Sequence, residues 1–169
     1  MNILLAVASK HGSTHEIADA LANELRVIGH IVDVYNAAAS PSPEAYDAVI
    51  LGSAIYAGSW LFPAKHFVER YRAELVGLPL WVFSSGPLGA ENPQPHNDPQ
   101  QLAASLSELP VRDHKVFVGK LDPSDLGVAE RLITKVVRTP MGDFRDWDAV
   151  RTWAHEIAAG LAIPADASD

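Results

Sequence analysis

The sequence alternates short apolar runs with segments whose apolar residues recur at helical spacing. Five runs are predicted strands, at residues 3–8, 31–35, 48–51, 80–83 and 116–118. Five segments are predicted helices, at residues 13–28, 63–75, 99–109, 126–138 and 147–161. Apolar strands separated by helices indicate a parallel sheet that is covered on both faces. We therefore expect an α/β fold: a doubly wound five-stranded parallel sheet, order 2-1-3-4-5, with helices on both faces.

The length of the chain, 169 residues, suits one domain with a sizeable core. No internal repeat and no linker that would divide the chain are evident in the sequence. We predict a single domain over residues 1–163, followed by a short disordered tail at residues 164–169.

Composition excludes several classes of function. The net charge of −8 at pH 7 argues against a general nucleic-acid binder, which usually carries a basic patch. The absence of cysteine excludes disulfides, thiolate metal sites, iron–sulfur clusters and cysteine nucleophiles. The histidines show no metal-ligand spacing, so we expect no metal site. No signal peptide or membrane-spanning run is evident, which predicts a cytoplasmic protein.

The turn between the first strand and the first helix predicts a phosphate site. Backbone N–H groups and hydroxyls in such a turn, together with the helix N-terminus, favour a bound anion. Glycine lets the backbone approach the anion and tolerates a positive φ. The alternative is an ordinary turn in which Ser13 or Thr14 is the N-cap. The candidate phosphate-binding residues are Ser9, Lys10, His11, Gly12, Ser13 and Thr14.

Two further small, glycine-containing segments follow the third and fourth strands. Ligands of open α/β sheets bind at the carboxyl ends of the strands, where the strand order reverses. Both segments are predicted loops at that crevice, where sheet packing alone does not require glycines such as Gly52. The candidates after the third strand are Ser53, Ala54, Ile55, Tyr56, Ala57 and Gly58. The candidates after the fourth strand are Ser84, Ser85, Gly86, Pro87, Leu88 and Gly89.

The signatures of other α/β sites are missing from the sequence. It contains no Gly-x-x-x-x-Gly-Lys-Ser/Thr, no Gly-x-Gly-x-x-Gly after the first strand and no Gly-x-Ser-x-Gly. A receiver domain shares the strand order but needs an aspartate at the end of the third strand. This chain has Gly52 and Ser53 there. These absences argue against a P-loop nucleotidase, a dinucleotide enzyme, a hydrolase and a receiver.

The turn with Ser9, Gly12, Ser13 and Thr14 resembles the phosphate loop of flavodoxins, and the second and third loops resemble the two that hold the flavin ring. More narrowly, the chain resembles the flavodoxin-domain group that contains menaquinone-dependent protoporphyrinogen dehydrogenase. The residues that carry this narrower resemblance are Leu51-Gly52-Ser53-Ala54-Ile55-x-x-Gly58, Phe67-Val68 and Asp146-Trp147 with the helix that follows. The resemblance implies non-covalent FMN and a quinone-linked oxidation of protoporphyrinogen IX in heme biosynthesis, with a quinone or a redox protein as partner.

Two alternatives to that activity remain open. One is a flavodoxin-type electron-transfer protein without a small-molecule substrate of its own, and the other is a binding module that has lost flavin. The additional residues 122–146 favour the enzyme, because an electron carrier needs an exposed ring edge rather than extra walls. No side chain in the three loops has a clear partner for acid–base work, so no catalytic residue is assigned.

Individual residues near the predicted site have two readings each. Tyr56 and Trp60 stack on the flavin ring or pack against the following helix, and we favour ring contact for Tyr56 only. Lys10 and His11 add charge near the phosphate or point to solvent while backbone amides do the binding, and we favour the second reading for both. The predicted helix 126–138 combines apolar and basic residues, which suit either packing on the sheet or peripheral contact with an anionic membrane.

Overall fold

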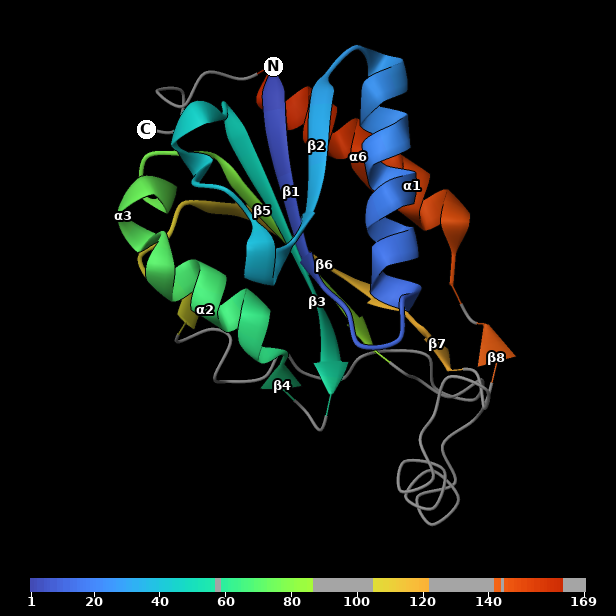
Figure 1. Ribbon diagram of the computed structural model, residues 1–169. Coiled ribbons are helices and arrows are strands. Elements are labelled where there is room, and N and C mark those ends of the chain that lie inside the picture. Colours follow the sequence, from blue (N-terminus) through green and yellow to red (C-terminus); the bar gives the residue numbers. More distant parts are fainter. Residues whose placement is uncertain (57–58, 87–104, 122–141, 144, 163–169) are drawn as a thin grey trace.

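The computed structural model describes residues 1–56, 59–86, 105–121, 142–143 and 145–162. Figure 1 shows a central sheet with helices on both sides. The predicted helix 126–138 and the predicted tail 164–169 lie outside the described residues. No helix within the described ranges has the length and apolar character needed to cross a membrane.

The sheet has the predicted topology. From one edge, the strands run β2 (Ile31–Asn36), β1 (Asn2–Ala8), β3 (Ala48–Tyr56), β5 (Leu80–Gly86) and β6 (Val111–Val118). All four pairings along this path are parallel. Counted without the short strand β4, the order is 2-1-3-4-5, so the predicted fold class is confirmed.

Helices cover the two faces of the sheet separately (Figure 1). One face carries α1 (Ser13–Ile28) and α6 (Trp147–Leu161), and the other carries α2 (Phe62–Arg70) and α3 (Arg72–Leu75). Each layer buries its own apolar cluster against the sheet, which is why the central strands are apolar on both faces. Two short 3₁₀ turns precede β3, at Ala37–Ala39 and Pro43–Ala45.

Helix α1 has the bounds that the sequence predicts. Gly29 ends it with φ of 112°, and its N–H bonds the carbonyl of Arg26 at 3.0 Å. A left-handed glycine is a common way to end a helix, because it carries no Cβ to strain the turn. The match shows that a helix with glycine at both ends can be located from sequence.

Strands β3 and β5 extend beyond their predicted ends. Residues 53–56 and 84–86, which we predicted as loops, are strand, and the parallel pairing of β3 with β5 continues with Ser53 opposite Ser84 and Ala54 opposite Ser85. The prediction was wrong because small polar residues lack the apolar signal of a strand, although they pair readily once a neighbouring strand lies beside them. The unpredicted strand β4 (Ser59–Trp60) then pairs antiparallel with the end of β3.

Other element bounds also differ from the prediction. The predicted helix 63–75 is divided at Tyr71 into α2 and α3. The predicted helix 99–109 lies largely outside the described residues, and the chain has left the helix by Glu108, whose φ is 69°. Strand β6 begins at Val111 rather than at residue 116, because charged residues on this edge strand hide its pattern.

Beyond β6, two short strands form a separate antiparallel pair. They are β7 (Lys120–Leu121) and β8 (Gly142–Asp143), with Lys120 opposite Asp143. We call these two strands with Arg145 the C-terminal arm. In Figure 1 the arm lies at the same end of the molecule as the N-terminus of α1.

Gly52 has a structural role that the sequence did not reveal. A Cβ atom at this position would lie 2.1 Å from Cζ of Phe83. The Phe83 ring is fully buried, with centroids 5.9 Å from the ring of Phe117 and 6.0 Å from that of Trp153. The glycine therefore makes room for an aromatic cluster in the core. Our expectation that sheet packing does not require a glycine here was wrong.

Replacing Gly52 with alanine should destabilise the fold, because the Phe83 ring is held by its neighbours and has little room to move. Overpacking of a core costs ~1–3 kcal/mol, and urea unfolding of both proteins would measure the difference. Gly77→Ala is the matched control, since the nearest atom to its added Cβ lies 3.7 Å away. Equal stability of Gly52→Ala and the unaltered protein would contradict this account.

Candidate functional site

The N-terminus of α1 has the geometry of an anion site. Gly12 is its N-cap, with φ of 85°, and a Cβ added there would meet no atom within 4 Å. No side chain caps the first turn, whose N–H groups also have no acceptor within the helix. The expected positive φ of Gly12 is confirmed. The alternative with Ser13 or Thr14 as N-cap is wrong, because both residues lie inside the helix.

The hydroxyls of this turn differ in their surroundings. Ser9 Oγ accepts a hydrogen bond from the Gly12 N–H at 3.0 Å, which closes the turn. Ser13 Oγ accepts one from the Lys120 N–H at 3.2 Å, so the Ser13 proton can still be donated to an anion. Thr14 is buried, and His11 is half-buried. Open N–H groups, the positive end of a helix and a hydroxyl donor together fit a phosphate group.

Lys10 and Tyr56 bring the first two candidate segments together. The Lys10 Nζ atom lies 3.7 Å from the centroid of the Tyr56 ring. Such a contact contributes about 0.5–1 kcal/mol at an exposed site, and Tyr56 is 41% exposed. The alternative in which Lys10 simply points to solvent is not what the structure shows. The end of β3 and the turn before α1 therefore face each other at the switch point of the sheet.

The second candidate segment is mostly strand rather than loop. Ser53 is fully buried, and its hydroxyl donates to the Ala54 carbonyl at 2.9 Å and accepts from the Leu61 N–H at 3.0 Å. Ala54 and Ile55 are half-buried. Ala57 and Gly58 lie outside the described residues. The Ser53 hydroxyl thus serves the packing of β3 against the start of α2.

The third candidate segment is also strand up to Gly86. Ser84, Ser85 and Gly86 are buried, while Pro87, Leu88 and Gly89 lie outside the described residues. The Gly86 carbonyl accepts from the Gly119 N–H at 2.7 Å, and a Cβ on Gly119 would lie 2.6 Å from that carbonyl oxygen. A glycine is needed at 119 so that the end of β5 and the start of the C-terminal arm can come this close.

Trp60 belongs to the core on the α2 face. It is 3% exposed, and its Nε1–H donates to Ser84 Oγ at 2.8 Å. The same oxygen lies 2.9 Å from Nε2 of His114, so one buried hydroxyl joins β4, β5 and β6. The structure therefore supports the packing reading of Trp60. The place of His114 in this network was not predicted, because nothing local in the sequence relates it to Ser84.

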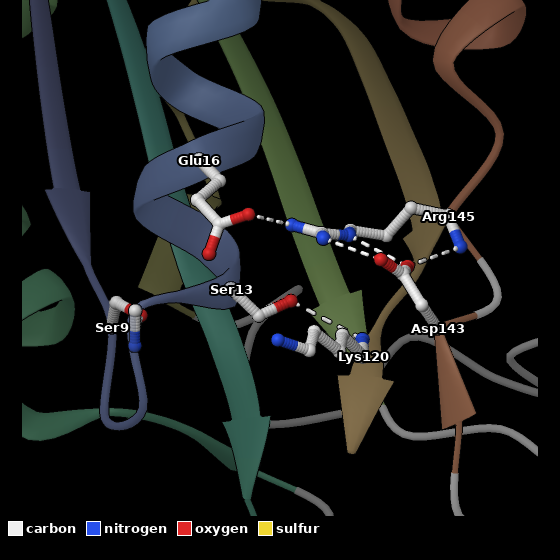
Figure 2. Close-up of polar contacts among 7 residues, drawn as sticks. Ser9, Ser13, Glu16, Lys120, Asp143 and Arg145 are labelled. Atoms are coloured by element: carbon white, nitrogen blue, oxygen red, sulfur yellow. Dashed lines mark hydrogen bonds and ion pairs between the residues drawn. The ribbon is translucent and has the colours of Figure 1, made fainter. Parts of the chain in front are cut away.

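Sequence reasoning also missed the charged cluster beside residues 9–14, which we call the phosphate turn after its predicted ligand (Figure 2). Arg145 donates to both carboxylate oxygens of Asp143, at 2.8 Å from Nε and 2.6 Å from Nη2. Its Nη1 donates to Oε2 of Glu16 at 2.6 Å. The guanidinium lies over the Trp147 ring, 4.5 Å from its centroid, and the Arg145 side chain is 5% exposed.

These contacts shift the ionisation of the partners. The hydrogen bonds from Arg145 hold the pKa of Asp143 below its usual value, although partial burial opposes the shift. The hydrogen bonds to Asp143, and then to Glu16, raise the pKa of Arg145 against the effect of burial. Asp143 and Arg145 are therefore both charged at neutral pH. Glu16 is in the first turn of α1, so the cluster lies next to the phosphate turn.

Comparison with known proteins places this geometry in a family. The family described as "Flavodoxin domain" matches residues 4–148. The chain is 26% identical over 173 residues to "Protoporphyrinogen IX dehydrogenase [quinone]" of Escherichia coli (strain K12), covering 94% of this chain and 95% of that protein.

Solved flavodoxins share the fold. Oxidised flavodoxin 1 from Bacillus cereus superposes with a TM-score of 0.64 at 18% identity, covering 96% of this chain and 100% of that one. A flavodoxin of Streptococcus pneumoniae TIGR4 gives a TM-score of 0.64 at 20% identity, covering 95% and 99%. The chain belongs to the flavodoxin domain family, and its cofactor is FMN.

Proposed function

We propose that this chain is an FMN-dependent oxidoreductase that removes hydrogen from protoporphyrinogen IX and delivers it to a quinone. The observation that carries the proposal is the match to the quinone-linked dehydrogenase of Escherichia coli, which spans 94% of this chain and 95% of that protein. A match of this extent includes the C-terminal arm and α6 as well as the sheet. The proposal therefore concerns the whole chain rather than the cofactor-binding part alone.

The FMN phosphate binds, in this proposal, at the first turn of α1. The open N–H groups after Gly12 and the Ser13 hydroxyl are its donors, and the positive φ of Gly12 keeps the backbone accessible. The ring lies beside the ends of β3 and β5, where Tyr56 offers a partly exposed aromatic surface. FMN supplies the electron-transfer chemistry when bound, and the chain positions and shields it.

The C-terminal arm favours an enzyme over an electron carrier. Its strands β7 and β8 pair with each other beside the N-terminus of α1, and the Lys120 N–H bonds Ser13 within the phosphate turn. An electron carrier needs an exposed edge of the flavin ring for docking with its partners. An enzyme with a flat substrate instead gains from additional protein walls around its binding site. The arm places such additional structure next to the turn that we assign to the phosphate.

An anaerobic assay with protoporphyrinogen IX and menadione tests the activity. We expect porphyrin fluorescence to appear in step with reduction of the quinone, because the quinone accepts the hydrogen that protoporphyrinogen IX loses. The FMN-free protein is the control. If no porphyrin forms while a flavodoxin reductase readily reduces the bound FMN, the chain is an electron carrier and the proposal is wrong.

Replacing Gly12 with valine should weaken FMN binding. A β-branched residue is strained at φ of 85°, so the turn would have to change and lose an amide contact to the phosphate. The expected loss is on the order of 1–3 kcal/mol, measured by fluorescence titration with FMN. Gly29→Val is the matched control, since Gly29 is also left-handed and ends the same helix. Unchanged FMN affinity of Gly12→Val would remove this turn from the site.

Replacing Tyr56 with alanine should weaken FMN binding and raise the residual fluorescence of the bound flavin. Stacking quenches flavin fluorescence and adds about 1 kcal/mol beyond area burial. Tyr35→Ala is the matched control, because Tyr35 is 38% exposed and lies on β2, which β1 separates from β3. If both variants retain the affinity and quenching of the unaltered protein, Tyr56 does not contact the ring.

A further inference from the structure

Arg145 carries a nearly buried guanidinium whose partners lie on three different elements, one of them 129 residues away in sequence. Its nitrogens bind Asp143 on β8 and Glu16 on α1, and its planar face packs on Trp147 at the start of α6. The planar guanidinium holds its N–H donors in a fixed geometry that suits this arrangement, and a lysine ammonium would not reproduce it. Arg145 thus fixes the position of the C-terminal arm relative to the first turn of α1 (Figure 2).

The same arm reaches the phosphate turn through a second contact. The backbone N–H of Lys120 on β7 donates to Ser13 Oγ at 3.2 Å, and Lys120 pairs with Asp143 across the arm. The contact directs a lone pair of Ser13 Oγ toward β7. The hydroxyl proton of Ser13 is therefore available for donation in a direction away from β7. The orientation of a donor for the phosphate therefore depends on where Arg145 holds the arm.

The charges of the cluster act on the same turn. Glu16 is one helical turn from Gly12, as its N–H bonds the Gly12 carbonyl at 3.0 Å. An acidic residue suits the start of a helix by itself, but it repels a phosphate that carries about two negative charges. The Arg145 guanidinium, which also pairs with Asp143, offsets part of the Glu16 charge through the ion pair at 2.6 Å.

We infer that Arg145 is a positioning residue for the FMN phosphate, acting through Glu16 and the C-terminal arm rather than by touching the cofactor. It offsets part of the charge of Glu16 in the first turn of α1 and holds β7 where it orients Ser13. This inference rests on the proposed phosphate site at α1. It is independent of the proposed substrate and electron acceptor.

Titration of Arg145→Gln with FMN and with riboflavin, which lacks the phosphate, tests the inference. We expect FMN binding to weaken about tenfold, equivalent to ~1.4 kcal/mol, while riboflavin binding stays unchanged. A general loss of structure would weaken both ligands alike. In Glu16→Gln/Arg145→Gln, part of the FMN affinity should return, because the unpaired carboxylate is gone. Arg151→Gln is the matched control, since Arg151 pairs with Asp148 on the exposed side of α6.

A second variant keeps the test decisive if Arg145→Gln folds poorly. Arg145→Lys retains the positive charge but loses the paired bonds to Asp143, and we expect it to bind FMN less than tenfold more weakly than the unaltered protein, with riboflavin binding unchanged. An unchanged preference for FMN over riboflavin in Arg145→Gln would overturn the inference, and so would equal losses for the two ligands. If Gly12→Val also leaves that preference unchanged, the proposed phosphate site itself is wrong. If only Gly12→Val reduces it, the role of Arg145 alone is wrong.

Discussion

The burial of β1 on both faces is the constraint on which the rest of the structure depends. Residues 3–8 are at most 1% exposed, and β1 pairs with β2 on one edge and β3 on the other. A strand with no exposed face requires a helical layer on each side, which α1 with α6 and α2 with α3 provide. The chain passes from β1 to β2 on one side and then crosses to β3 on the other, so the carboxyl ends of β1 and β3 flank the switch point. The turn at Gly12 lies there as a result of the topology.

The candidate site combines backbone N–H groups with side chains from segments that are distant in sequence. The hydroxyls of Ser53 and Ser84 are occupied by partners within the protein, where they join β3, β4 and β5. They stabilise the edge of the sheet on which a ligand would lie. The N–H groups after Gly12 are the part of the site that suits an anion, while the charge balance around them comes from Arg145, outside all three predicted loops.

Much of the fold could be predicted from the sequence, because its signals are local. The apolar runs located the five main strands, and glycines at both ends fixed the bounds of α1. The ends of β3 and β5 were missed, since small polar residues form strands here only because a neighbouring strand pairs with them. Gly52 was misread because its reason is the ring of Phe83, which is distant in sequence. The ion pair of Arg145 with Glu16 is likewise a product of tertiary structure and has no sequence signal. The FMN contacts of the candidate residues stay predictions.

The contact between Arg145 and Glu16 joins positions that are 129 residues apart. During synthesis the phosphate turn therefore emerges early, whereas its counterion emerges only when most of the chain has been made. A nascent chain that ends before the C-terminal arm has the turn, but it has an uncompensated carboxylate beside it. On the role that we infer for Arg145, full affinity for FMN is reached only once the arm has been made.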